Sequence, residues 1–221
     1  QIDAIHNRYP NAQFIDRRIG GMGTDPGRLA SEWAPRLGNL RVRFGVRFFQ
    51  VLNESDIEES WPTGTTNEQK AQAVTDWMAA FGSEWASFNT GVDLLFPPWS
   101  GDFGKFFEDP VQGIWLKGVT AAGCKGVALH VYGDQNTPLD ANIDHFCEWA
   151  ESRIIEGRLP SDIEIHITET NWGNTGNKPA DYGDQLFRGY DRAYGHPVCR
   201  SVEPFIWVWF NMPDTLNIRG D

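Results

Sequence analysis

Two glutamates stand directly after short apolar runs of the chain. Glu54 follows residues 47–52, with Asn53 between them, and Glu169 follows residues 163–168. A carboxylate at the end of an apolar strand is costly to bury unless it has a partner. Carboxyl groups that lie close together can act as general acids, general bases or nucleophiles. A strand-end glutamate is also a common salt-bridge partner or helix cap, so neither residue alone decides between catalysis and structure.

Further polar and aromatic residues stand at or near the ends of other apolar runs. Active sites of parallel barrels lie at the carboxyl ends of the strands, so the joint occurrence of such residues indicates a site. Taken singly, His130 would be a satisfied buried imidazole and Trp209 a core residue. The residues concerned are His130 and Tyr132 in the run 126–132, Asn171 and Trp172 behind Glu169, and Trp207 and Trp209 in the last run.

Short apolar runs alternate with helical patterns along the chain. This alternation predicts a parallel sheet covered by helices, because strands buried on both faces read as continuous apolar runs. A doubly wound sheet is the rival, but residues 20–23, Gly-Gly-Met-Gly, match its glycine-rich phosphate loop poorly. The predicted strands are 12–19, 47–52, 92–96, 126–132, 163–168 and 204–210, and the predicted helices are 27–37, 67–88, 111–122, 143–155 and 182–194, after a helix end at 2–9.

Net charge and composition limit the classes of partner that this chain is expected to bind. A formal net charge of −11 at pH 7 argues against a nucleic-acid partner, since phosphate binding needs a basic surface, and it favours a neutral substrate. No apolar run reaches the roughly 18 residues of a membrane span, so none is expected. Ten tryptophans are consistent either with core packing or with ring faces that stack on sugars.

The cysteines point away from a metal centre. Cys124, Cys147 and Cys199 are widely spaced and form no CxxC motif, so no zinc site is expected. An odd number excludes complete pairing within the chain, and we interpret all three as small buried residues. The compartment stays open, with a secreted or extracellular location slightly favoured.

The order of these motifs resembles the clan A glycoside hydrolases, a superfamily of (β/α)8 barrels that includes cellulases, mannanases, xylanases and β-glycosidases. Residues 48–54, Phe-Phe-Gln-Val-Leu-Asn-Glu, look like its fourth strand, and residues 163–169 look like its seventh. His130-Val131-Tyr132 is similar to the His-x-Tyr that ends strand six in several member families. Residues 205–209 fit strand eight, whose end often supplies a tryptophan platform. The resemblance covers essentially the whole chain.

The resemblance implies an α/β fold, a (β/α)8 TIM barrel, that hydrolyses β-glycosidic bonds in a poly- or oligosaccharide with retention. Glu54 would be the acid/base and Glu169 the nucleophile, with carboxyl groups roughly 5–5.5 Å apart. Asn53 would bind the sugar 2-hydroxyl, Tyr132 would hydrogen-bond Glu169, and His130 would bind a substrate hydroxyl or orient Glu54. The expected sugar-stacking residues are Trp209, Trp207, Trp172 and Trp99, the last two with loop packing as an equal alternative.

No cofactor is expected, because a metal-dependent barrel hydrolase would show strand-end ligands such as His-x-His. A catalytically inactive barrel that binds glycans or proteins remains an alternative. Glu58 and Glu59 are expected on a solvated loop. His166 has the opposite parity to Glu169, so it is expected to face the helices.

The N-terminus departs from the family pattern. If Asn53-Glu54 ends strand four, residues 12–19 form strand three, and strands one and two are absent. We therefore interpret residues 1–221 as a single catalytic barrel domain that is incomplete, with strands three to eight, and expect the missing strands from a parent chain or another chain. The arginine that often supports the nucleophile from strand two in this family cannot be assigned.

The platform role of Trp209 is testable. Trp209→Ala should weaken sugar binding or turnover and leave the melting temperature nearly unchanged, whereas truncation of a core tryptophan costs roughly 3–5 kcal/mol. Thermal melts and saccharide kinetics on the same variant separate the two roles. A large fall in melting temperature with unchanged kinetics would place Trp209 in the core.

Overall fold

The computed structural model describes residues 14–17, 21–100, 109–134, 136–172 and 179–204. Six strands form one parallel sheet in sequential order, from β1 at one edge to β6 at the other. This is the arrangement of six consecutive strands of a (β/α)8 barrel, and it confirms the predicted architecture. The strands are β1 (Phe14–Arg17), β2 (Val46–Gln50), β3 (Asp93–Phe96), β4 (Gly126–Gly133), β5 (Glu164–Trp172) and β6 (Cys199–Pro204).

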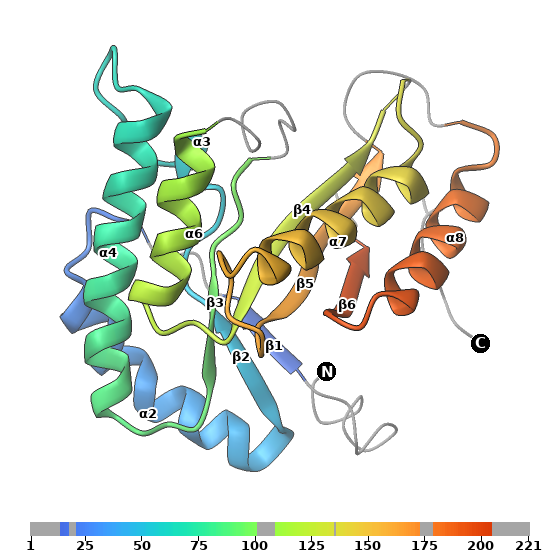
Figure 1. The fold of residues 1–221 in the computed structure, drawn as a ribbon. Helices are drawn as coiled ribbons and strands as arrows, with labels where there is room; N and C mark the ends of the chain where they lie inside the picture. The colour runs from blue at the N-terminus through green and yellow to red at the C-terminus, as the bar shows by residue number, and fades with distance from the viewer. Residues whose placement is uncertain (1–13, 18–20, 101–108, 135, 173–178, 205–221) are drawn as a thin grey trace, which may run out of the picture.

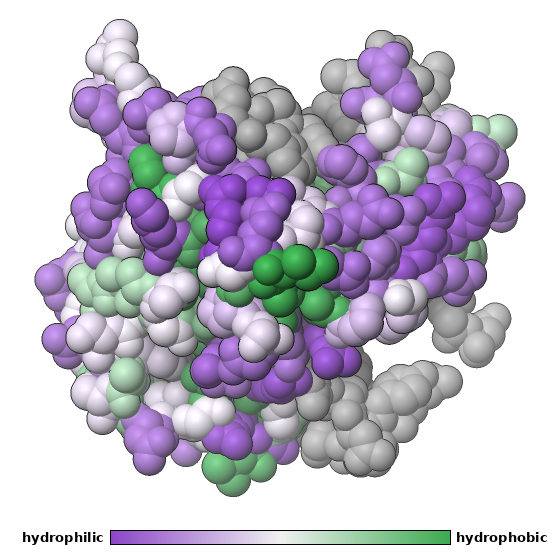
Figure 2. All heavy atoms as spheres, viewed as in Figure 1, coloured by the Kyte–Doolittle hydropathy of each residue, from purple (hydrophilic) through white to green (hydrophobic). Residues whose placement is uncertain are grey.

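Helices follow the strands and cover one side of the sheet (Figure 1). The face seen in Figure 2 is mostly hydrophilic over α8, as expected for a helix whose apolar side packs on strands. No helix in the described ranges combines the length and hydrophobicity needed to cross a membrane. The helices are α2 (Pro26–Phe44), α3 (Ser55–Glu58), α4 (Asn67–Ser87), α6 (Val111–Ala121), α7 (Leu139–Ile155) and α8 (Tyr182–Gly195).

Helix α2 extends beyond its predicted end at residue 37. It begins at Asp25, whose side chain accepts from the backbone N–H of Arg28, and the glycine at position 38 does not end it. The helix stops at Gly45, which has a φ of 69° and donates its N–H to the carbonyl of Arg41. That left-handed conformation is accessible to glycine at little cost, so Gly45 is the true C-terminal signal.

The last predicted strand, 204–210, lies almost wholly outside the described residues. The structure has an earlier strand, β6, which ends at Pro204 and pairs Cys199 with Ile165 and Val202 with Ile167. Strand β6 was not predicted from the sequence, because the charged residues Arg200 and Glu203 interrupt the apolar pattern. Pairing with β5 overrides this weak local signal.

Apolar side chains pack in two layers. The larger cluster fills the space between the sheet and the helices, and the small inner cluster comprises Phe48, Leu95 and Ala128, with Ile15 packed against it. All three cysteines are buried and free, as expected. The outer layer therefore holds the helices on the sheet, and the inner one fills the barrel side.

An irregularity in β5 changes which side chains face inward. Leu129 of β4 pairs with Ile167 but His130 pairs with Glu169, so Thr168 is an extra residue in β5. An extra residue shifts the alternation of side chains along a strand. His166 consequently faces the inner side, where its ring lies 4.5 Å from that of Phe48. The prediction that His166 faces the helices was wrong, because it assumed strict alternation as far as Glu169.

Burial of His166 predicts a pH dependence of stability. Burial lowers the pKa of His166 from 6.5 to about 3, so the unfolded chain takes up a proton below pH 6.5 while the folded chain does not. Stability should therefore fall as pH decreases from about 6.5 towards 3, by up to about 1.4 kcal/mol per pH unit. His166→Gln should remove this component, which urea unfolding at pH 7 and pH 5 would measure.

The exposed His145 offers the matched control, because His145→Gln also removes an imidazole. That variant should keep the wild-type difference in unfolding free energy between the two pH values. Equal pH dependence in the wild type and His166→Gln would contradict a neutral buried imidazole.

Candidate active site

The carboxyl ends of four strands bring the predicted polar residues together. Arg17 ends β1, Glu54 and Asn53 follow β2, and β4 and β5 supply the remaining groups, His130, Tyr132 and Glu169. Arg17 forms an ion pair with Glu169, although three strands lie between β1 and β5 in the sheet. Neighbouring strands are about 4.8 Å apart, so this contact is possible only because the sheet curls.

Glu169 is a buried carboxylate with a partner on each oxygen. It is 5% exposed, and Arg17 contacts its Oε1. Tyr132 donates its hydroxyl proton to Oε2 over 2.5 Å, the contact expected from the sequence. Burial, followed by the bond to Glu169, raises the pKa of Tyr132, so the phenol stays a donor. These donors favour the ionised form of a carboxylate.

His130 lies between the two glutamates. Its Nδ1 is 2.7 Å from Oε1 of Glu54 and 3.5 Å from Oε2 of Glu169. Burial lowers the pKa of His130 to about 3, so the imidazole is neutral at ordinary pH. Its Nε2 is buried and has no hydrogen-bond partner among the described residues. The structure thus places His130 against Glu54, one of the two positions considered for it.

Arg17 is the site residue that sequence reasoning missed. Its guanidinium contacts Glu169 and also donates to Oδ1 of Asn53. The family resemblance points to an arginine on the second barrel strand, whereas Arg17 ends β1. The sequence held one signal for Arg17, a charged residue near the end of the predicted strand 12–19.

The loop after β2 contributes more than solvated carboxylates. Glu58 is exposed, but its Oε1 accepts from Nδ2 of Asn53, and Oε1 of Glu59 accepts from the backbone N–H of Met22 over 2.8 Å. Glu58 is thus solvent-exposed, as expected, and the carboxylates of both residues also accept hydrogen bonds. Burial is the main cause that raises the pKa of Glu58, and the hydrogen bond from Asn53 opposes it.

Buried Asp56 ties this loop to the chain after β3. Its carboxylate accepts from both the backbone N–H and the hydroxyl of Ser100, while the backbone carbonyl of Asp56 accepts from Lys70 over 2.7 Å. Burial raises the pKa of Asp56 and the Ser100 bonds oppose that rise. These contacts hold the segment that begins at Glu54.

Of the four tryptophans predicted to stack on sugars, the structure describes the side chain of Trp99 only. Trp99 is 4% exposed, belongs to the outer cluster, and its Nε1 has no hydrogen-bond partner in the described part of the chain. That burial favours the loop-packing alternative for Trp99. The backbone of Trp172 ends β5, and its side chain, like Trp207 and Trp209, lies outside the description.

Glu54, His130 and Glu169 also have the donor types of a metal site. One donor atom from each lies within 4.8 Å of the others. Both oxygens of Glu169 are already engaged, however, and a cation here would stand beside the guanidinium of Arg17. The charge distribution therefore suits a proton or a neutral ligand better than a metal ion.

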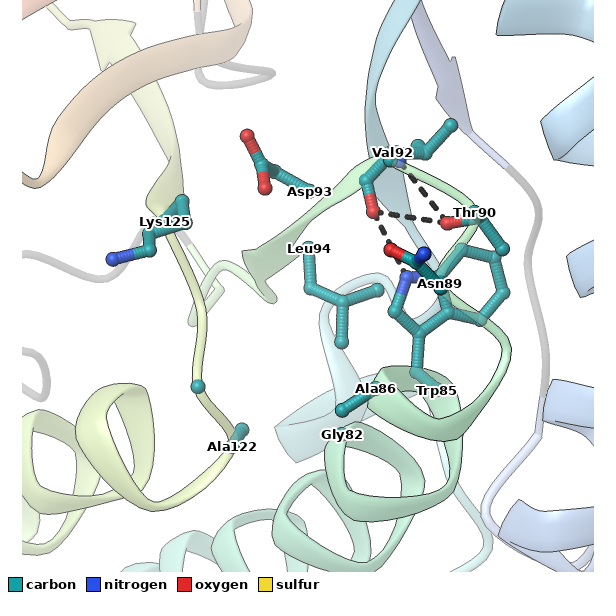
Figure 3. Close-up of a pocket in the computed structure, with 12 residues that line it drawn as sticks. Gly82, Trp85, Ala86, Asn89, Thr90, Val92, Asp93, Leu94, Ala122 and Lys125 are labelled. Atoms are coloured by element: carbon teal, nitrogen blue, oxygen red, sulfur yellow. Dashed lines mark hydrogen bonds between the residues drawn. The ribbon is translucent and has the colours of Figure 1, made fainter.

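A cavity of about 250 Å³ lies at the other end of the strands from the glutamates, near the start of β3. Figure 3 shows its wall, with Asp93, Lys125 and the end of α4 around it. There Trp85 donates its indole N–H to the carbonyl of Val92 over 2.9 Å. Because this cavity opens at the N-terminal ends of the strands, it is separate from the two glutamates.

Comparison with known proteins places this fold among glycoside hydrolase barrels. A GH128 (subgroup I) endo-β-1,3-glucanase from Amycolatopsis mediterranei, solved with laminaritriose, has a TM-score of 0.56 and 16% identity over 87% of this chain and 71% of that chain. A GH128 (subgroup VI) exo-β-1,3-glucanase from Aureobasidium namibiae has a TM-score of 0.52 and 16% identity, covering 92% and 67%.

A psychrophilic glycoside hydrolase family 10 endo-β-1,4-xylanase aligns with a TM-score of 0.53 and 13% identity, covering 92% of this chain and 70% of that chain. No protein-family model matches this chain, and no curated protein matches it by sequence. The chain thus shares the fold of these enzymes, and the predicted resemblance to the clan A barrel is confirmed at the level of fold.

The Arg17–Glu169 pair predicts a stability effect. Arg17→Met should lower the free energy of unfolding by about 2–3 kcal/mol, because it leaves a buried carboxylate without its cation. The figure is below the roughly 3–5 kcal/mol of a fully buried pair, since the Arg17 side chain is 24% exposed. Adding Glu169→Gln should restore most of the loss in urea unfolding. Equal destabilisation by Arg17→Met with and without Glu169→Gln would show that Arg17 acts through packing.

Proposed function

We propose that this chain is a glycosidase that hydrolyses β-glycosidic bonds in a neutral poly- or oligosaccharide with retention of configuration. The carrying observation is that single oxygens of Glu54 and Glu169 lie within 4.8 Å of each other and of His130. Retaining enzymes hold their carboxyl groups about 5–5.5 Å apart, whereas inverting enzymes need about 6.5–9.5 Å for an intervening water. The 4.8 Å bound joins single oxygen atoms, and it fits the closer arrangement, in which one carboxylate attacks directly.

The environments of the two glutamates support distinct roles. Glu169 has contacts from Arg17 and Tyr132, which suit an ionised nucleophile. Glu54 has a more exposed side chain, 15% against 6% for Glu169, and contacts a neutral imidazole. We therefore assign the nucleophile to Glu169 and the acid/base to Glu54.

His130 gives Glu54 a defined proton position in this proposal. A neutral imidazole carries one proton, and we assign it to Nδ1, the nitrogen that faces the glutamates. Nδ1–H then donates to Oε1 of Glu54, which leaves Oε2 to carry the acid proton. The acid proton is thereby directed away from His130.

The reaction proceeds in two displacements. Glu54 protonates the glycosidic oxygen as Glu169 attacks the anomeric carbon, the leaving sugar departs, and a glycosyl ester forms on Glu169. Glu54, now ionised, removes a proton from water, which attacks the same carbon and frees Glu169. Asn53 is the proposed contact to the sugar 2-hydroxyl, which strengthens in the transition state.

The substrate class follows from charge and from fold-level analogy. A net charge of −11 suits a neutral glycan. The similar structures are named as β-1,3-glucanases and a β-1,4-xylanase, which makes laminari- and xylo-oligosaccharides the first panel to test. Proton NMR of the anomer formed first would distinguish retention from inversion. In the proposed reaction no metal takes part, so protein treated with a chelator should keep full activity.

The acid/base assignment predicts chemical rescue. Glu54→Ala should slow hydrolysis of an activated aryl glycoside by roughly 10²- to 10⁴-fold, because deglycosylation loses its general base. Azide should restore turnover and give a glycosyl azide of retained configuration, since the small anion attacks without deprotonation. The product is identified by NMR. Absence of rescue, with an unchanged rate, would remove Glu54 from this role.

Glu169→Gln is the matched comparison in the same assay. It keeps the shape of the side chain but cannot attack, so turnover should disappear and azide should not restore it. A wild-type chain that binds the oligosaccharides without cleaving any of them would instead identify a glycan-binding barrel.

A further inference from the structure

The turn after β2 holds Glu58 above the candidate site. The backbone N–H of Glu58 bonds to the carbonyl of Glu54 over 2.8 Å, which folds the chain back by one helical turn. Trp61 donates to the carbonyl of Ser55 over 2.8 Å and Lys70 to that of Asp56 over 2.7 Å, so the turn is anchored from outside. The position of Glu58 is therefore set by the fold, although its side chain is exposed.

Both polar atoms of the Asn53 side-chain amide form hydrogen bonds. Arg17 donates to Oδ1, and Nδ2 donates to Oε1 of Glu58. A flipped amide would place Nδ2 against a guanidinium that can only donate, and would set Oδ1 against a carboxylate oxygen of Glu58, two acceptor atoms face to face. Glu58 and Arg17 together therefore select one amide orientation. Nδ2 carries a second N–H besides the one that it donates to Glu58.

We propose that Glu58 is a positioning residue for the glycosidase reaction, acting through Asn53. It fixes the orientation of the Asn53 amide, so that the second N–H of Nδ2 donates to a hydroxyl of the sugar that Glu169 attacks. This inference rests on the proposed function. It assigns to an exposed loop carboxylate the role of orienting a substrate contact, with no direct part in bond making or breaking.

A double-mutant cycle between Glu58 and Asn53 tests the inference. Glu58→Ala should lower kcat/KM on a cleaved oligosaccharide by about 10- to 100-fold, the usual effect of losing a hydrogen bond to a charged group. Glu58→Gln should stay within about threefold of the wild type, because the glutamine oxygen still accepts from Nδ2. In an Asn53→Ala background, Glu58→Ala should add less than about threefold, since its target is gone.

Glu59→Ala is the control, because it removes the next carboxylate of the same loop, which accepts from Met22 and not from Asn53. It should retain near wild-type kcat/KM, and thermal melts of all variants check folding. The inference is overturned if Glu58→Ala costs as much in the Asn53→Ala background, if Glu58→Gln is as impaired as Glu58→Ala, or if Glu59→Ala is equally impaired. An active wild type with an unaffected Glu58→Ala refutes this inference alone, whereas a wild type that cleaves no glycoside refutes the proposed function as well.

Discussion

Burial of the Glu169 charge is the constraint on which the rest of the site depends. A carboxylate that is 5% exposed is stable only with a cation and donors close by. Arg17 and Tyr132 meet that need from β1 and β4. Because β1 and β5 are not neighbours in the sheet, the pair can form only when the six strands curl. The ion pair and the curvature therefore depend on each other.

The extra residue in β5 lets Glu169 be buried on the same face of the sheet as the small inner apolar cluster. Strict alternation would put His166 and Glu169 on opposite faces, yet both point inward because Thr168 is left over in the pairing with β4. His166 then extends the small inner cluster beside Phe48, and Glu169 stands above it at the mouth. A bulge next to a functional carboxylate re-aims the side chain at a local cost in strand pairing.

The neutral charge state of His130 affects how the two glutamates interact. Two carboxyl groups this close repel each other when both are charged, and a protonated imidazole would favour the ionised form of both. Burial keeps His130 uncharged, so it contributes a single oriented hydrogen-bonding group. The guanidinium of Arg17 contacts Glu169, which places positive charge beside that carboxylate.

The sequence by itself determined the order of elements and the identity of most of the site. Apolar runs and helical periodicity gave five of the six described strands at nearly the observed positions, and the strand-end pattern selected Glu54, Glu169, His130 and Tyr132. These are local properties, carried by hydropathy and by the residue types next to it. Only the tertiary structure decided the partnership of Arg17 with Glu169, the engagement of Glu58 by Asn53, the inward face of His166 and the existence of β6. Each of these depends on a contact between segments distant in sequence or on a register shift between strands, and neither leaves a mark in the local pattern from which periodicity is read.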